Sequence, residues 1–281
     1  MLMTPRRITE EDFHKFQDYF YRKTGVRFEE TKRYFVDKRL LERMQATASD
    51  DFRRYFTLLR SEPSGTEMQA LINIMTVNET YFFREEYQFC CLVNSILPEL
   101  VARKRPGEPI RIWVVPSSSG EEAYSIAICL LERWTGLQTW DVEIISSDID
   151  TNVLARAQAG CYSARSIQHV PAAYLRRYFR QTDRGFQLDR GVCDSVSFTR
   201  VNLQEAGQMR NYHDFDVIFC RNLLIYFDDL SRHQAAETLF DALQPGGYLL
   251  LGHSESMSRS SALYKIRKFP EAIVYQRAVG E

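Results

Sequence analysis

A chain of 281 residues allows one large domain or two smaller ones, and its apolar content of 44% supports a buried core. The formal net charge of −1 argues against a general nucleic-acid binder, which is usually basic. No apolar run approaches the ~18–20 residues of a membrane span, and residues 1–7 lack the apolar core of a signal peptide. The six cysteines show no CxxC spacing and the five histidines form no HxxxH pair. We therefore expect reduced thiols, no metal site and a cytoplasmic location.

Residues 1–76 are predicted to form a helical N-terminal domain. Thr9 precedes three acids and a run of apolar residues at helical spacing, so it is a candidate N-cap. Asp50 is predicted to cap a third helix, and Ser64 with Glu67 forms the pattern of a capping box for a fourth. No alternating strand pattern interrupts this region.

One face of the second predicted helix is basic. Its cationic residues outnumber the acidic Asp37 and Glu42, and they are Lys32, Arg33, Lys38, Arg39 and Arg43. Such a face is compatible with a partner that carries negative charge and equally with plain exposure to solvent.

Residues 77–107 are predicted to be a linker with a helix, and residues 108–281 alternate between strands and helices. The expected strands are residues 110–115, 142–147, 217–220 and 248–252. The expected helices between them are residues 121–133, 151–159 and 228–243. This alternation predicts an α/β fold with a doubly wound, mostly parallel sheet. A period-2 pattern between residues 185 and 201 adds a small antiparallel β excursion at about 160–201, and residues 273–275 are compatible with an antiparallel edge strand.

The segment from Phe215 to Phe227 is the most informative in the chain. Its residues 217–220 are apolar without alternation, as in a strand covered on both faces. The polar pair Arg221 and Asn222 follows at the carboxyl end, where open α/β sheets bind ligands. Tyr226 has apolar neighbours in the sequence, and its hydroxyl could point into an active site. A core tyrosine after an ordinary loop would give the same pattern.

The junction after the first predicted strand lacks the glycine fingerprint of dinucleotide-binding folds. It carries Gly120 alone, preceded by three serines and followed by Glu121 and Glu122. Acids are poor neighbours for a diphosphate and suit a cationic ligand. The alternative is that both acids only complement the dipole of the helix they begin.

An acid also ends the second predicted strand. Asp148 stands where nucleoside-binding sheets bind ribose hydroxyls, while Asp150 is placed to cap the next helix. Together with the acids at residues 121 and 122, this pattern favours a nucleoside that has a positive charge and no diphosphate. S-adenosylmethionine has an adenosine, a sulfonium and an ammonium, and it fits this description.

The segment from Asn78 to Arg84 connects the helical region to the sheet and contains three aromatic residues between polar ends. Arg84 is always charged and offers five donors in a fixed fork, which suits a carboxylate. The competing interpretation is a structural salt bridge from Arg84 to Glu85 or Glu86.

These motifs resemble those of the bacterial chemotaxis receptor glutamate O-methyltransferases of the CheR type. The matching elements, in the family's order, are residues 78–84, 118–125, 147–150, 202–203, 219–227 and 245–255, and they span nearly the whole chain. One element departs from the family: its small residues before Ser-Thr-Gly are Val114 to Ser117 here, and Ala123 replaces the usual proline. This turn is bulkier and stiffer than the family's.

The resemblance implies a class I methyltransferase-like domain at residues 108–281, preceded by a helical domain, with S-adenosylmethionine as cofactor and S-adenosylhomocysteine as product. The helix within residues 77–107 would face the cofactor. Arg84 and Tyr226 are the implied catalytic residues. The implied cofactor-binding residues are Asn78, Thr80, Arg84, Glu121, Asp148, Asn202, Leu203, Arg221 and Asn222.

The implied substrate is a glutamate side chain on a chemoreceptor's cytoplasmic domain, which the basic face would steer to a monomeric enzyme. A glutamate carboxylate has a pKa near ~4.3 and is already an anion at neutral pH, so its methylation needs no general base. A non-catalytic CheR-like binding module is the main alternative. A nucleic-acid or small-molecule methyltransferase is disfavoured by the near-neutral charge, and an NAD-dependent oxidoreductase by the missing glycine fingerprint.

Overall fold

The structure is a computed structural model that describes residues 8–257 and 263–278. Residues 1–7, which sequence analysis considered as a leader, lie outside the described residues. The contacts divide the chain into one unit of residues 1–77 and 226–231 and a second unit of residues 78–225 and 232–281. No helix within the described ranges is long and apolar enough to cross a membrane.

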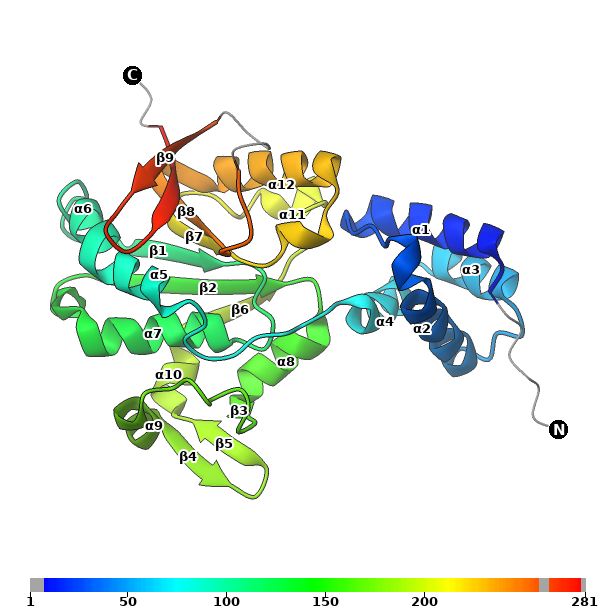
Figure 1. Cartoon of the computed structure of the whole chain (residues 1–281), viewed down its shortest axis with the longest axis horizontal. Coiled ribbons are helices and arrows are strands. Elements are labelled where there is room, and N and C mark those ends of the chain that lie inside the picture. Colours follow the sequence, from blue (N-terminus) through cyan, green and yellow to red (C-terminus); the bar gives the residue numbers. More distant parts are fainter. Residues whose placement is uncertain (1–7, 258–262, 279–281) are drawn as a thin grey trace. The chain divides into compact units, whose positions relative to one another are not determined.

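The first unit is all helical (Figure 1). Its helices are α1 (Glu10–Thr24), η1 (Glu30–Lys32), α2 (Arg33–Ala46), α3 (Phe52–Ser61) and α4 (Thr66–Met75). Thr9 caps α1, because its side chain accepts from the amide of Asp12 while the Asp12 carboxylate accepts from the amide of Thr9. Phe13, Phe16 and Phe20 follow one another at spacings of three and four residues and are all buried on one face of α1.

Two expected caps in this unit are wrong. Asp51 rather than Asp50 caps α3, and its side chain accepts from the amide of Arg54. No capping box forms before α4, because Gly65 occupies the cap position and the Glu67 carboxylate turns into the unit instead. Local pattern alone could not show that Glu67 has a stronger partner elsewhere.

The second unit is an α/β domain. Some of its helices come before the first strand, and the others lie between strands along the chain. Those that precede or accompany the sheet are α5 (Glu86–Cys91), η2 (Leu92–Ile96), α6 (Leu97–Val101), α7 (Glu121–Arg133), η3 (Thr135–Gln138), α8 (Thr151–Ala159), α9 (Ala172–Tyr178), α10 (Arg190–Asp194), α11 (Ala206–Met209), η4 (Leu224–Tyr226) and α12 (Asp229–Ala242), of which η4 and α12 run into residues 226–231. Figure 1 shows α7 and α8 on one side of the large sheet and α12 on the other.

The large sheet has seven strands in the order β6-β2-β1-β7-β8-β10-β9. Its strands are β1 (Ile110–Val114), β2 (Val142–Asp148), β6 (Val196–Arg200), β7 (Phe215–Cys220), β8 (Leu243–Leu251), β9 (Tyr264–Lys268) and β10 (Ile273–Arg277). The first five strands in this order run parallel, and β10 and β9 pair antiparallel at the far edge. The predicted α/β fold with a mostly parallel sheet is confirmed.

The chain order reverses at the centre of this sheet. From β1 the chain proceeds to β2 and β6 on one side, and then returns to β7 and β8 on the other. The crevice outside the carboxyl ends of β1 and β7 is therefore the topological switch point, where open α/β sheets bind ligands. All six residues of β7 are buried, as expected for a strand covered on both faces.

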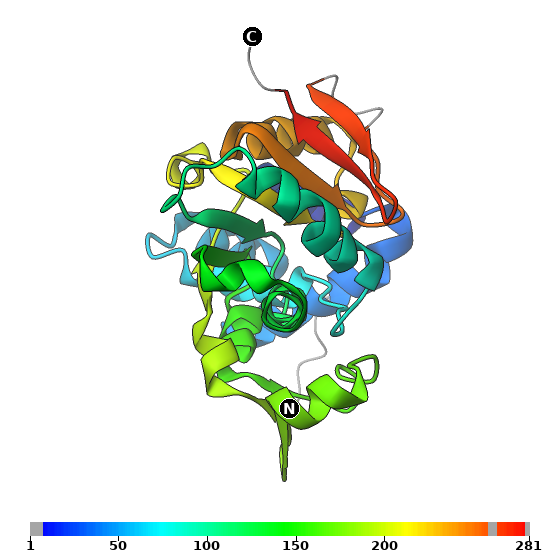
Figure 2. The same cartoon turned by 90° about the vertical axis from the view of Figure 1, so that its left-hand side faces the viewer.

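The small sheet contains β3 (Cys161–Tyr162), β5 (Gly185–Leu188) and β4 (Phe179–Thr182), paired antiparallel in that order. Its strands are labelled in Figure 1, and Figure 2 shows them nearly edge-on, projecting away from the large sheet. The β excursion expected at about 160–201 is shorter in the structure, so the expected extent is wrong. β6 pairs in parallel with β2, from Ile144 opposite Val196 to Asp148 opposite Arg200. Its alternating pattern reflects the half-exposed edge of the large sheet rather than membership of the small one.

Candidate active site

Side chains from three strand ends meet at the switch point. The β1–α7 loop is tied to the end of β2, because Ser117 donates its amide to the Ser147 carbonyl at 2.7 Å and Ser118 donates to the Asp148 carboxylate at 2.7 Å. Gly120 then begins α7 with φ of 91°, and a Cβ there would lie 2.9 Å from that of Ala157. Only glycine suits this left-handed position against a neighbouring helix.

Asp148 ends β2 and is 4% exposed. One of its carboxylate oxygens accepts the amide of Ser118 and the other accepts the amide of Asp150 at 2.9 Å. Burial raises the pKa of Asp148 to about 6, against the hydrogen bonds that favour its anion. A carboxylate has about four acceptor positions, so the Asp148 carboxylate is able to accept a ligand hydroxyl as well.

Glu121 and Glu122 occupy the first turn of α7. The Glu121 side chain is buried, and one of its oxygens accepts the Ser166 hydroxyl. One oxygen of Glu122 binds Arg221 at 3.0 Å, and burial raises the Glu122 pKa. The second oxygen of each carboxylate is buried and has no hydrogen-bond partner among the described residues.

Unpartnered polar atoms gather at this edge of the sheet. Besides these two carboxylate oxygens, the buried hydroxyls without a described partner include those of Ser117, Ser118 and Ser146. Buried polar groups in folded proteins are nearly always hydrogen-bonded. A polar ligand with cationic and hydroxyl groups would satisfy these atoms, so the residues present fit a charged nucleoside such as S-adenosylmethionine.

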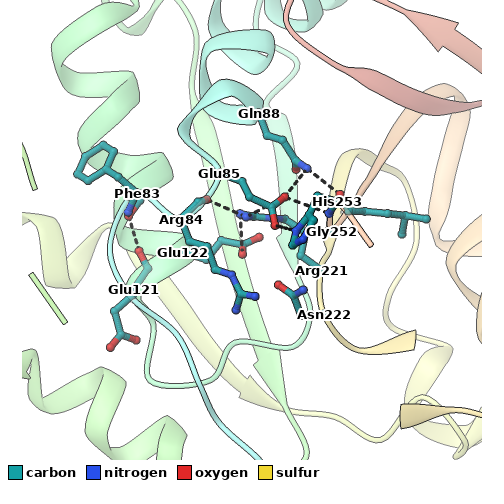
Figure 3. A network of polar contacts seen from close by, with 12 residues as sticks. Phe83, Arg84, Glu85, Gln88, Glu121, Glu122, Arg221, Asn222, Gly252 and His253 are labelled. Carbon is teal, nitrogen blue, oxygen red and sulfur yellow. Dashed lines mark hydrogen bonds and ion pairs between the residues drawn. The ribbon is translucent and has the colours of Figure 1, made fainter. Parts of the chain in front are cut away.

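Arg221 follows β7 and is 3% exposed. Its guanidinium lies 3.0 Å from Glu122 and 3.3 Å from Glu85, and it donates to the main-chain carbonyl of Arg84 at 2.7 Å. Figure 3 shows these groups converging from separate elements.

Glu85 is the acid that sequence analysis considered as a salt-bridge partner for Arg84. The structure pairs Glu85 with Arg221 and pairs Glu86 with Arg133, so that interpretation is wrong. The Glu85 carboxylate also accepts from the His253 ring at 2.8 Å. Burial disfavours the Glu85 anion, but Arg221 and the His253 bonds outweigh burial and hold the Glu85 pKa below its usual value.

Arg84 is half-buried, and its guanidinium donates to the Glu79 carbonyl at 3.1 Å and lies 5.8 Å from the centre of the Tyr81 ring. Among the residues that the structure describes, Arg84 forms no ion pair. Its positive charge acts on the nearby Glu122, where it favours the carboxylate anion and so opposes the rise in the Glu122 pKa caused by burial.

The segment before Arg84 is tied to the end of β2. Asn78 donates its side-chain amide to Asp150 at 2.9 Å, and Asp150 also caps α8. Thr80, from the same segment, is half-buried. Two of the predicted site residues, Asn78 and Asp148, thus converge on Asp150.

Asn222 has φ of 59° and donates its amide to Glu255 at 2.7 Å. Glu255 also accepts from the amides of Leu224 and Gly252, so one carboxylate holds the loop after β7. A Cβ on Gly252 would lie 2.9 Å from the Asn222 side chain and 2.9 Å from the Glu255 carboxylate, so a larger residue there would displace one of them.

Asn202 and Leu203 follow the end of β6. Asn202 is 4% exposed and Leu203 is half-buried. The Asn202 amide donates to Gln208 at 2.9 Å, and its side-chain oxygen accepts from Gln204 at 3.1 Å. This turn begins at the same edge of the sheet as Asp148, because β6 runs parallel to β2.

Tyr226 belongs to the first unit, where its carbonyl accepts from the amide of Arg27. Arg84 belongs to the second unit, and the shared role of Arg84 and Tyr226 stays a prediction. Asp228 precedes α12, and its side chain accepts from the amide of Ser231 at 2.9 Å.

Several residues that organise this site were not among the site residues predicted from the sequence. They are Glu85, Gln88, Ser166, His253 and Glu255, and each acts through contacts distant in the sequence. The signal that could have found Glu85 and Glu255 is their place beside the predicted motifs, at the ends of residues 78–84 and 245–255.

The comparisons agree with this geometry. Residues 78–273 match the family described as "CheR methyltransferase, SAM binding domain", and residues 11–76 match "CheR methyltransferase, all-alpha domain". "Chemotaxis protein methyltransferase 2" of Vibrio cholerae is 52% identical over 271 residues, covering 96% of this chain and 94% of the relative. "Chemotaxis protein methyltransferase 2" of Pseudomonas aeruginosa is 37% identical, with coverage of 92% and 90%, and "Chemotaxis protein methyltransferase" of Salmonella typhimurium is 34% identical, with coverage of 92% and 88%.

The doubly wound sheet and the acid-rich edge at its switch point are those of an S-adenosylmethionine-dependent methyltransferase. Within that class, the chain belongs to the CheR methyltransferase family. The resemblance noted in the sequence is confirmed.

Proposed function

We propose that the chain transfers the methyl group of S-adenosylmethionine to glutamate side chains on the cytoplasmic helices of a chemoreceptor, giving glutamyl methyl esters for chemotactic adaptation. The names of its relatives support this substrate. The observation that carries the proposal is that the Arg84 guanidinium, which forms no ion pair with any described residue, lies in the same unit as the buried Glu121 and Glu122 oxygens that lack a described partner.

The bound cofactor would supply an electrophilic methyl carbon, whose bond to sulfur breaks as a carboxylate oxygen attacks. Glu121 would hold the ammonium of its methionine end, and Asp148 would accept the ribose hydroxyls. Asn202 and Leu203 would border the adenine. Asn78, Thr80 and the loop of Arg221 and Asn222 would complete the pocket.

Arg84 and Tyr226 would orient the substrate carboxylate. The carboxylate is ionised at neutral pH, and the reaction disperses both its charge and that of the sulfonium. The chain therefore needs no general base, and catalysis would come from positioning and exclusion of water, for which intramolecular models allow ~7–11 kcal/mol.

We propose that the basic face is the surface that faces the receptor. Fewer of its five cationic residues take part than the sequence indicated. Arg43 pairs with the buried Glu67 at 2.6 Å, Arg33 pairs with Asp37 at 2.9 Å, and Arg39 lies 3.2 Å from Glu42. Lys32 and Lys38 remain exposed. These two lysines are the candidates for steering an acidic receptor helix toward the enzyme.

The test is transfer of a radiolabelled methyl group to purified chemoreceptor cytoplasmic fragments. Label that is released by mild base identifies a methyl ester, and label that appears on a fragment whose target glutamates are replaced by alanine would exclude this substrate. The proposal also has the enzyme act as a monomer in the cytoplasm, which size-exclusion chromatography and cell fractionation would check.

A further inference from the structure

Arg221 is buried between two acids that come from different helices. Its side chain is 1% exposed, while Glu85 belongs to the turn before α5 and Glu122 to the first turn of α7 (Figure 3). A buried cation needs one good partner, and a second buried carboxylate adds desolvation cost. The arrangement therefore calls for an explanation beyond stability.

The Arg221 side chain is almost fully buried, and its two terminal nitrogens are directed at the protein, while Nε has no hydrogen-bond partner among the described residues. Nη1 is directed at Glu122, and Nη2 is shared between Glu85 and the main-chain carbonyl of Arg84. Its cation also lies 5.7 Å from the centre of the Phe89 ring. These contacts argue that the side chain of Arg221 acts on the protein rather than on the cofactor.

The segment that Arg221 holds has a strained backbone. Phe83 and Glu85 have φ of 61° and 56°, so left-handed residues flank Arg84 on both sides. Bulky residues adopt this conformation only where surrounding contacts impose it. The Phe83 amide donates to the Ser125 hydroxyl at 2.9 Å, and the bond from Arg221 to the Arg84 carbonyl supplies the second constraint.

We propose that Arg221 is a positioning residue: by binding Glu85, Glu122 and the Arg84 carbonyl at once, it fixes the 83–85 turn so that the Arg84 guanidinium faces the substrate carboxylate. This inference rests on the proposed function only for the role of Arg84 toward the substrate. The constraint on the turn is a property of the chain itself.

Arg221→Lys is the central variant, because lysine keeps the charge and loses the planar fork that reaches three acceptors. Lys104→Met is the matched control. Lys104 forms a buried pair with Asp216 at 2.9 Å, and Asp216 and Arg221 stand at opposite ends of β7. Both variants thus disturb a buried ion pair on the same strand, and only one of them touches the Arg84 turn.

The first measurement is hydrogen exchange of the amides in residues 83–88, followed by mass spectrometry in the full chain without substrate. We expect Arg221→Lys to speed this exchange at least tenfold, and Lys104→Met to leave it within twofold. Unchanged exchange in Arg221→Lys would overturn the proposal, whether or not the enzyme methylates receptors.

The second measurement is a double-mutant cycle with Arg84→Ala, read as kcat on a receptor fragment. Arg221→Lys should lower kcat at least tenfold in the wild-type background and less than twofold in the Arg84→Ala background, with kcat measured at saturating cofactor so that a change in cofactor Kd does not enter the comparison. Equal losses in both backgrounds, or a loss confined to cofactor Kd, would overturn it.

If Arg221→Lys does not fold, Glu85→Gln replaces it in both measurements, since it removes one ion pair and leaves the Arg221 cation paired with Glu122. The same exchange and coupling are expected. Absence of methyl transfer by the wild-type chain would count against the proposed function and leave the exchange result to decide the positioning role.

Discussion

The Asp148 carboxylate accepts the backbone amide of Ser118 across 2.7 Å, which joins the end of β2 to the loop that follows β1. The two loops belong to neighbouring parallel strands, so their relative position decides the width of the ligand crevice. Asp148 therefore contributes to the shape of the site as well as to any contact with ribose.

Replacing Asp148 with alanine should weaken S-adenosylmethionine binding by at least about tenfold. Hydrogen bonds to a charged acceptor contribute roughly 1.5–3 kcal/mol, and both hydroxyl contacts and the bond to Ser118 are lost. Isothermal calorimetry measures the effect, with circular dichroism as the fold control. An affinity within twofold of wild type would mean that Asp148 serves the loops alone.

The same carboxylate predicts a pH dependence of stability in the absence of cofactor. The folded-state pKa of about 6 lies above the usual value of 3.8, so the folded state favours the protonated form. Its stabilising contribution is complete below pH 3.8 and is lost as pH rises through about 6. The free energy of unfolding of wild type, relative to Asp148→Ala, should fall by about 2–3 kcal/mol from pH 4 to pH 7.

Urea unfolding of both proteins at several pH values gives this difference directly. The comparison with the variant cancels contributions from other titrating groups that the two proteins share. A difference that is constant from pH 4 to pH 7 would show that the Asp148 carboxyl titrates near its usual value.

Glu121→Gln should weaken binding of S-adenosylmethionine and S-adenosylhomocysteine by similar factors of about five- to twentyfold. The amide keeps an oxygen for the Ser166 hydroxyl and loses the negative charge that would face the ammonium, which both ligands carry. Calorimetry with each ligand tests this. A loss limited to S-adenosylmethionine would instead place Glu121 beside the sulfonium.

Much of the fold could be predicted because its signals are local. The helices 121–133 and 151–159 were expected with the boundaries that the structure has, since Gly120 and Asp150 mark their starts and Gly160 ends α8. The pairing of strands is not local. β6 carries the alternation of a half-exposed strand, and nothing within it tells whether its partner is β2 or the small sheet.

The difference between local and non-local signals also explains which residues of the candidate site could be predicted. Asp148 and the acids of α7 were predicted because each stands at a strand or helix end, where the topology brings ligands. The partner of Glu85 could not be predicted, because Arg221 lies 136 positions further along the chain (221 − 85). Arg43 likewise appeared to be a surface cation until the fold placed the buried Glu67 beside it.

Lys32→Glu combined with Lys38→Glu should raise the KM for receptor fragments several-fold at low salt. Both lysines are exposed, and reversing their charge removes the attraction to an acidic helix. The effect should shrink at about 0.5 M salt, where screening is strong, and cofactor Kd should not change. Lys265→Glu with Lys268→Glu on β9 is the control with the same charge change, and an equal rise in its KM would show that only net charge matters.

Arg84 and Tyr226 are expected to affect turnover more than binding. Arg84→Lys keeps the charge and loses the planar fork that matches a carboxylate, and Tyr226→Phe keeps the ring and loses the hydroxyl. Each should lower kcat at least about tenfold, which corresponds to ~1.4 kcal/mol of barrier, with circular dichroism unchanged. Because the attacking carboxylate is already ionised, the pH profile of kcat should lack the inflection of a general base near neutrality. Methyl-transfer kinetics of both variants from pH 6 to pH 9 test this, and turnover near that of wild type in both would remove the two residues from the mechanism.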